Sequence, residues 1–206
     1  ARLVRVASRN PAAPALVGPG CSVVSDWREL AAAGDLDGVV IATPPSLHVP
    51  MARAALHAGK AVFIEKPLSL EPLEARSLLS LARRRRRLVL VDHIHLFHPA
   101  YQGLKRLGGR LGPLRFIESA GGNRGPFRRD TPPLWDYGPH DVAMALDLAG
   151  EVPSEVRARR EHAEDLPAGR GEVWRIELRF PGGIRARLRV GNLLARKSRR
   201  LKASFE

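Results

Sequence analysis

Hydrophobic residues follow two different patterns along this chain, and the change falls near its middle. In the N-terminal half, short apolar runs alternate with segments of helical periodicity. The runs cover residues 3–7, 37–43, 62–64 and 88–91. Continuous apolar runs separated by helices are typical of parallel strands buried on both faces. This half therefore predicts an α/β domain with a parallel sheet, in which residues 37–43 form a fully buried strand.

The helices between these runs have recognisable ends. Asp26 stands three residues before Glu29, the spacing of a capping box, and the helix that it opens should end near Gly34. Ser46 can cap a helix through residues 51–57. A third, amphipathic helix is expected over residues 70–83.

Beyond Gly150 the hydrophobic period becomes two. Apolar residues alternate with charged ones over residues 174–180 and again over 184–190, on either side of a Pro-Gly-Gly turn. This pattern predicts an antiparallel hairpin with one apolar and one charged face. A further strand is expected at residues 201–205. We therefore predict a Rossmann-like domain over residues 1–98 and an α+β domain with a mostly antiparallel sheet over 99–206.

Composition narrows the class of protein. The 206 residues are 44% apolar, and no apolar run is long enough to span a bilayer. The N-terminus lacks a signal-peptide pattern, so we expect a cytoplasmic protein without membrane partners. Cys21 is the only cysteine, which excludes an internal disulfide and a cysteine-based metal site.

The chain is strongly basic. Thirty-four basic against twenty-one acidic residues give a net charge of +13, which permits attraction to polyanions. The excess is mainly arginine and is spread along the sequence, apart from five arginines at 83–87 that suit a helix C-terminus. A solvated surface is the favoured interpretation. A cationic nucleic-acid binder is the minority one, and it would show a steep salt dependence.

The first chemical motif is Glu65-Lys66-Pro67, directly after the apolar run 62–64. Open α/β sheets bind their ligands at the carboxyl ends of the strands. A partly desolvated lysine at such an edge can donate a hydrogen bond to a substrate oxygen, and Glu65 can orient it. The Lys66–Pro67 bond is a candidate cis peptide.

The second chemical motif is Trp135-Asp136-Tyr137-Gly138-Pro139-His140-Asp141. Pro139 suits the first turn of an apolar helix over residues 142–148. That helix start would leave His140 near its N-terminus and Asp136 just before it. A capped helix with a buried histidine is the alternative.

Three segments in order, DGVVIATPPSLH, AALHAGKAVFIEKPLS and LWDYGPHDVAMALDL, resemble the Gfo/Idh/MocA family of nicotinamide-dependent oxidoreductases. The resemblance covers nearly the whole chain. It implies hydride transfer between NAD(P) and a carbinol carbon of a sugar, cyclitol or related polyol. It also implies a homo-oligomer that associates through the C-terminal sheet.

The resemblance carries over residue by residue. It implies catalytic roles for Lys66, Asp136 and His140, with His140 as general base and Lys66 as the group that stabilises charge on the oxygen. On the cofactor side it indicates Glu65 and Lys66 together with three residues of the preceding loop, which are Thr43, Pro44 and His48. His48 equally fits a capping or surface histidine.

The choice between NADP and NAD depends on the end of the strand at residues 3–7. An acidic residue there would hold the ribose 2′-hydroxyl of NAD. Ser8 and Arg9 occupy the position instead, and a guanidinium suits a 2′-phosphate, so NADP is preferred. A solvated Arg9 is the equal alternative.

The chain contains no G-x-G-x-x-G. By resemblance, the first strand, glycine turn and helix should precede Ala1, and the second domain should continue past Glu206. We therefore expect a chain that is incomplete at both ends. A non-catalytic sensor or scaffold of the same fold, which has lost the dinucleotide turn, is the rival interpretation.

Two loops are expected to border the substrate. His95 lies in the first, which follows the strand at 88–91, and Asn123 and Arg124 lie in a glycine- and arginine-rich loop over 121–130 that follows a strand at 114–120. His93 and His95 would share one face if the earlier strand continued, with His98 a turn beyond. That makes a metal site conceivable, but the resemblance requires none, so no metal is assigned.

Overall fold

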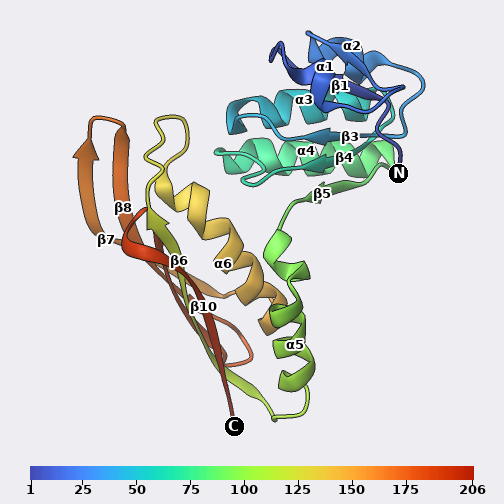
Figure 1. Ribbon diagram of the computed structural model, residues 1–206. Helices are drawn as coiled ribbons and strands as arrows, with labels where there is room; N and C mark the ends of the chain where they lie inside the picture. Colours follow the sequence, from blue (N-terminus) through green and yellow to red (C-terminus); the bar gives the residue numbers. More distant parts are fainter. The chain divides into compact units, whose positions relative to one another are not determined.

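The computed structural model describes all 206 residues and divides into two compact units, Ala1–Asp92 and His93–Glu206 (Figure 1). Residues 93–98, which the sequence analysis placed at the end of the first domain, begin the second unit. No helix combines the length and apolar composition needed to cross a membrane.

The first unit contains parallel strands and the helices that connect them. β1 (Arg5–Ala7) pairs with β2 (Ser22–Val24), and a separate sheet has the order β3 (Gly38–Ile41), β4 (Ala61–Ile64), β5 (Val89–Val91). The helices are α1 (Ala13–Leu16), α2 (Trp27–Ala32), α3 (Pro45–His57) and α4 (Pro72–Arg85). The expected Rossmann-type arrangement of parallel strands and helices is confirmed.

Local signals account for several helix ends in this unit. Asp26 caps α2 by accepting a hydrogen bond from the Arg28 backbone N–H at 2.9 Å, as the sequence predicts. At the other end of α2, the buried Lys60 donates to the Ala33 carbonyl at 2.5 Å, which satisfies an acceptor that the helix leaves open.

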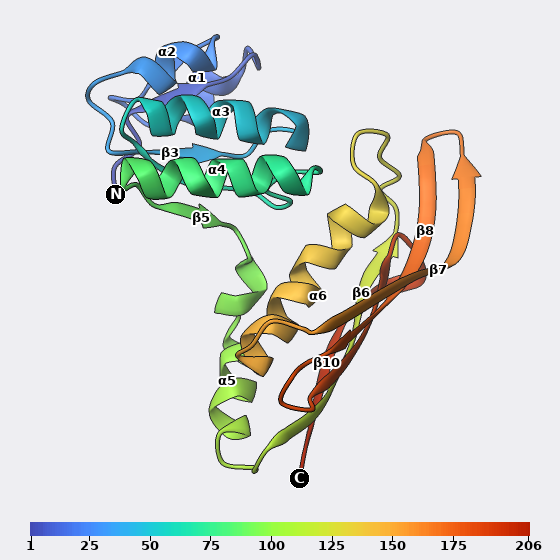
Figure 2. The same ribbon diagram turned by 180° about the vertical axis from the view of Figure 1, so that it is seen from behind.

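Helices α3 and α4 cover one face of the β3–β4–β5 sheet. Figure 2 shows the two helices on that side of the sheet. Ile41, Val62 and Ile64 pack there against Leu56 and Leu78. On the opposite face, the strand register aligns Val40, Phe63 and Leu90 in one row.

The expectation that residues 37–43 form a fully buried strand is wrong. Val40 is 72% exposed, because no element covers that face of β3. The edges of β1 and β3 are not hydrogen-bonded to each other, and a cavity of about 990 Å³ lies between them, lined by residues 1–7 and Val39–Ile41.

The second unit is a helix packed on a mixed sheet. Its elements are η1 (Ile94–Phe97), α5 (Pro99–Gly108), β6 (Leu114–Arg124), α6 (Pro133–Ala149), β7 (Glu155–Leu166), β8 (Gly169–Arg179), β9 (Arg185–Gly191) and β10 (Leu193–Phe205). The sheet order is β10-β6-β9-β8-β7, and only the β6–β9 pair is parallel. The predicted hairpin is β8–β9, so the expected mostly antiparallel sheet is confirmed.

Helix α6 covers the apolar face of this sheet. Ala145 packs against a cluster from the strands that includes Ile117, Ile176 and Leu188. Helix α5 is attached to α6 by Tyr101, whose hydroxyl donates to the Asp147 carboxylate at 2.6 Å. Burial and this carboxylate raise the pKa of Tyr101, so the phenol stays protonated and keeps donating.

Two expectations about this unit are wrong. Helix α6 begins at Pro133 and not near Val142, because the earlier proline supplies the first turn and Pro139 is accommodated inside the helix. β6 continues through Arg124 because β9 and β10 flank it, so residues 121–124 are strand and not loop. The chain after β5 turns into η1, so the condition under which His93 and His95 would share a strand face is not met.

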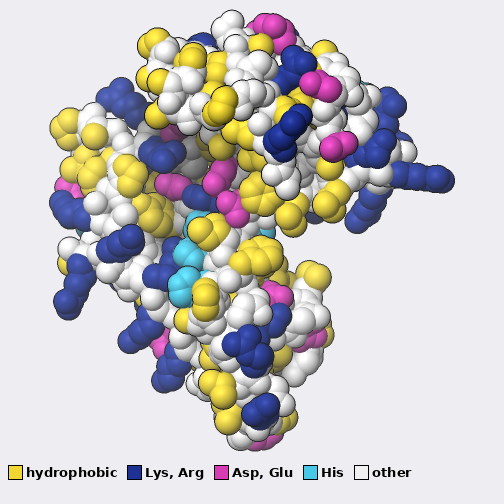
Figure 3. Space-filling model, turned by 45° about the vertical axis from the view of Figure 1, so that its right-hand side comes forward, with side chains coloured by type: hydrophobic (Ala, Val, Ile, Leu, Met, Phe, Trp, Pro, Cys, Tyr) yellow, Lys and Arg dark blue, Asp and Glu magenta, His cyan; other side chains and the backbone are white.

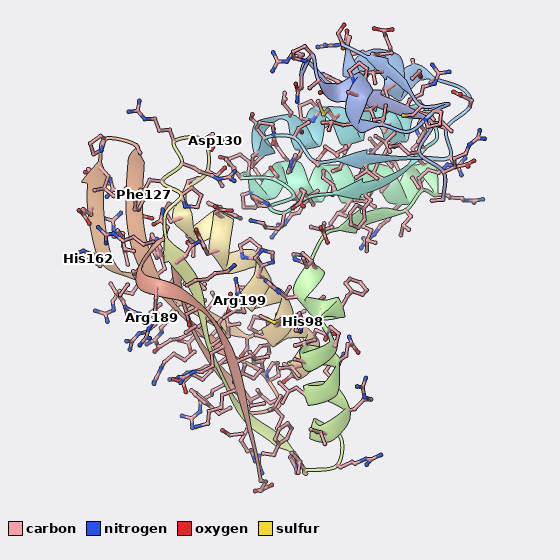
Figure 4. All side chains as sticks on the ribbon, in the orientation of Figure 1. His98, Phe127, Asp130, His162, Arg189 and Arg199 are labelled. Carbon is pink, nitrogen blue, oxygen red and sulfur yellow. The ribbon has the colours of Figure 1, made fainter.

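Glycine at position 121 makes room for a buried ion pair. Arg199 of β10 stands opposite Gly121 of β6 in the strand register, and its guanidinium reaches across Gly121 to the fully buried Asp141 carboxylate of α6. Figure 4 labels Arg199 on its strand. A Cβ at residue 121 would lie 2.4 Å from Arg199 Nη1 and 2.6 Å from Asp141 Oδ2. The sheet and α6 are therefore joined by a charge pair that occupies the space a side chain at residue 121 would need.

We expect Gly121→Ala to lower the free energy of unfolding by about 1–3 kcal/mol, because the methyl group overpacks the Asp141–Arg199 contact. The matched control is Gly103→Ala in α5, where the nearest atom would be Arg106 Nη2 at 4.0 Å. That change should stabilise by about 0.5–1 kcal/mol, since alanine favours a helix interior. Urea denaturation of both variants measures the difference, and equal stability of the two would contradict the packing argument.

Candidate functional site

Two loops of the first unit leave its sheet at the same edge. β3 and β4 are parallel, Ile41 pairs with Ile64, and the Glu65 N–H donates to the Ile41 carbonyl at 2.9 Å. The loop with Thr43 and Pro44 therefore starts beside the Glu65–Lys66 turn. The structure thus brings together four of the residues assigned to the cofactor side, and Pro44 among them is exposed.

The Glu65-Lys66-Pro67 turn is held by several contacts. The Lys66–Pro67 peptide is cis, as the sequence analysis suggested. Glu65 Oε2 accepts from the Lys66 backbone N–H at 3.2 Å. Beyond the turn, the buried Ser69 hydroxyl donates to Glu74 of α4 at 3.1 Å. These contacts hold the backbone on both sides of Lys66.

His48 lies beneath both loops. It is fully buried, with Nδ1 2.8 Å from the Pro67 carbonyl oxygen and Nε2 2.7 Å from the Thr43 carbonyl oxygen. The family resemblance implied that His48 lies on the cofactor side. The structure places its ring between two backbone segments, so both its nitrogens contact protein.

Ser8 and Arg9 follow directly after β1. The Ser8 hydroxyl accepts from the Asn10 backbone N–H at 3.1 Å, which shapes the turn. Arg9 is exposed. This placement leaves the guanidinium accessible at the carboxyl end of a parallel strand, and the NADP assignment stays a prediction.

In the second unit, Asp136 and His140 lie one turn apart on α6. Residues four apart share a helix face. The sequence placed Asp136 before the helix, so this shared face was not expected. The His95 ring of η1 contacts the His140 ring edge-on, with centroids 4.5 Å apart. Arg128 Nε is 3.7 Å from Asp136 Oδ2. Figure 3 shows histidine side chains gathered in one place on the surface.

Asn123 and Arg124 are strand residues with different surroundings. Tyr137 of α6 donates to Asn123 Oδ1 at 2.5 Å and lies 2.8 Å from the Gly125 carbonyl oxygen. Burial, with a further contribution from the Asp136 charge, raises the pKa of Tyr137 and keeps this donor protonated. Arg124 is exposed. The structure therefore attaches Asn123 to the helix that carries His140.

Asp141, the residue after His140, has a charged partner that could not be predicted from the sequence. Burial raises the pKa of Asp141, and Arg199, the Ser119 hydroxyl and the charge on His95 oppose that rise. Asp141 follows His140 directly in the motif, but nothing in the sequence links it to Arg199, 58 residues away. Only the pairing of β10 with β6 reveals this partner.

The residues at the carboxyl ends of β3 and β4 are suited to contact one part of a dinucleotide. An exposed loop, a lysine and backbone groups meet at the carboxyl ends of parallel strands, where such ligands bind. Thr43, Pro44, Glu65 and Lys66 would hold the group there. The glycine-rich turn that cradles a pyrophosphate is not among these 206 residues.

Comparison with known proteins gives a consistent result. Residues 1–93 match the model of the Gfo/Idh/MocA family, described as an oxidoreductase family with an NAD-binding Rossmann fold. UDP-N-acetylglucosamine 3-dehydrogenase of Acidithiobacillus ferrooxidans is 31% identical over 175 residues, which cover 84% of this chain and 54% of that protein. Inositol 2-dehydrogenase of Rhizobium meliloti is 34% identical over 169 residues, covering 77% of this chain and 50% of that protein. The chain thus spans about half the length of these curated relatives.

A solved structure extends the likeness to the second unit. The crystal structure of a protein from Magnetospirillum magnetotacticum, assigned as an oxidoreductase, is 40% identical and superposes with a TM-score of 0.94. The match covers 100% of this chain and 67% of that one. The fold, the motif residues and these relatives agree, and the chain belongs to the Gfo/Idh/MocA family of oxidoreductases.

Proposed function

We propose that this chain forms part of an NAD(P)-dependent dehydrogenase that oxidises a carbinol carbon of a sugar, cyclitol or related polyol, or reduces the corresponding ketone. The observation that carries the proposal is the pair Asp136 and His140 on one face of α6, with the His95 ring against His140. Two relatives that bear dehydrogenase names for a nucleotide sugar and for inositol support the substrate class.

The proposed chemistry assigns a residue to the proton and another to the oxygen of the substrate hydroxyl group. In the oxidative direction, His140 takes the proton of the substrate hydroxyl, since an imidazole ordinarily titrates near neutral pH. Lys66 donates a hydrogen bond to the same oxygen and stabilises the charge that develops there. Asp136, one turn from His140, orients the imidazole or the substrate. Bound nicotinamide supplies the hydride acceptor.

His95 and Asn123 are the proposed substrate contacts, the first through its place beside His140 and the second through its bond to Tyr137. Arg124, which is exposed, is the third. A sheet-mediated homo-oligomer belongs to the same proposal.

Titration with NADPH and NADH, followed by nicotinamide fluorescence, tests the proposal. The 206-residue chain is compared with the longest form that can be expressed, called here the extended form. We expect the extended form to bind, and to bind more tightly than the shorter one, because the glycine turn that cradles phosphates is not in residues 1–206. Binding by neither form would overturn the dehydrogenase proposal in favour of a sensor or scaffold.

We expect Lys66→Ala to lower kcat by about 10²–10³-fold, the usual effect of removing one donor to a developing oxyanion. The Kd for cofactor should change much less than kcat, because Thr43, Pro44 and Glu65 remain to hold the cofactor. Lys197→Ala, at an exposed lysine of β10, is the matched control and should keep parental kinetics. Steady-state turnover with a panel of polyols and sugars gives the comparison, and turnover that survives in Lys66→Ala would show that the assignment of Lys66 is wrong.

Arg9→Ala tests the cofactor preference. If Arg9 pairs with a 2′-phosphate, its removal should weaken NADPH binding about 10- to 150-fold, since a charge-assisted hydrogen bond contributes about 1.5–3 kcal/mol. Binding of NADH should be unaffected. Arg110→Ala, an exposed arginine of the second unit, serves as the control for net charge. Equal losses for the two cofactors would contradict the preference for NADP.

A further inference from the structure

The His48 ring joins the two loops that leave the β3–β4 edge. One nitrogen contacts the carbonyl of Thr43, which precedes α3, and the other contacts the carbonyl of Pro67, which follows Lys66. His48 itself lies in α3 and is fully buried. The ring therefore spans from the start of its own helix to the neighbouring turn.

Both partners of the ring are hydrogen-bond acceptors. A carbonyl oxygen has no proton to give, so each contact is a hydrogen bond only if the ring nitrogen carries one. A neutral imidazole has a single N–H, and its second nitrogen would direct a lone pair at an oxygen less than 3 Å away. Only an imidazolium satisfies both contacts at once. Two charge-assisted hydrogen bonds then offset part of the desolvation of the buried cation.

The contact with Pro67 is placed to affect Lys66. Within the turn, the Glu65 N–H donates to Ile41 and the Glu65 carboxylate accepts from the Lys66 N–H, and Ser69 connects the chain onward to α4. The His48 ring connects the residue after Lys66 to the Thr43 loop. Pro67 is buried, so its carbonyl has little access to water as a substitute partner.

We propose that His48 is a positioning residue, protonated on both ring nitrogens, that fixes the Lys66 turn relative to the Thr43 loop. The kinetic part of this proposal rests on the proposed function of Lys66, and the protonation state does not. A neutral, purely structural histidine is the outcome that would overturn it.

The protonation state is measured first, by ¹⁵N NMR of the histidine rings in the 206-residue chain at neutral pH. We expect both nitrogens of His48 to be protonated, with His48→Gln used to assign the signals. His57, an exposed histidine at the end of the same helix, is the internal comparison. An unprotonated ring nitrogen in His48 would overturn the proposal whether or not the protein proves to be a dehydrogenase.

The positioning role is measured with a double-mutant cycle in the extended, cofactor-binding form. A glutamine at residue 48 can reach one carbonyl but not both, so His48→Gln should lower kcat about 10–100-fold with a small change in KM. In the Lys66→Ala background the same substitution should have almost no further effect on kcat, because it acts through Lys66. His57→Gln is the control and should match the parent.

The failures of the two proposals are distinguishable. An equal loss from His48→Gln in both backgrounds would show a general structural role and would overturn the positioning role. Unchanged kcat in His48→Gln would do the same. Full turnover in Lys66→Ala would instead overturn the proposed function of Lys66. Hydrogen exchange of the backbone amides of residues 65, 66, 68 and 69 would still report whether His48→Gln loosens the turn, and unchanged exchange there would overturn the positioning role.

Discussion

The parallel register of β3 and β4 is the constraint on which the candidate site of the first unit depends. Ile41 stands opposite Ile64, so both chains leave the sheet at the same level. Helix α3 then returns His48 beneath the two loops. A slip of one residue would turn Ile64 away from the core and separate the Lys66 turn from the Thr43 carbonyl. Hydrophobic burial of one face therefore fixes the geometry of the polar residues at the strand ends.

The sheet of the second unit carries many arginines, and carboxylates pair with some of them. Glu161 lies between Arg175 and Arg189 and accepts from them at 2.6 and 2.7 Å. The hydrogen bond from Arg189 is the main reason why the pKa of Glu161 lies below its usual value. Lys and Arg are dispersed over the face seen in Figure 3. Much of the basic excess thus lies on a solvated surface where arginines pair with carboxylates. This favours a solvated surface over nucleic-acid binding as the interpretation of the +13 charge.

Some elements follow from local sequence, and others form only through tertiary contacts. The Asp26 cap, the Pro-Gly-Gly hairpin and the alternation in β8 and β9 predicted their elements because each depends on neighbours in the chain. β7 was missed, since a strand rich in Arg and Glu has no apolar period and forms only because β8 offers a free edge. The start of α6 was predicted too late, because Pro139 suits a first turn but lies inside a longer helix that begins at Pro133.

The sequence by itself determined which chemical groups the protein has and on which kinds of element they lie. The Glu65-Lys66-Pro67 turn after a strand and the Asp136 to His140 motif were both visible, since each is a contiguous stretch. Tertiary structure alone decided the partners. The His48 bond to Pro67 and the Arg199 pair with Asp141 join residues 19 and 58 positions apart. Such contacts depend on strand pairing and helix packing, and no local pattern encodes them.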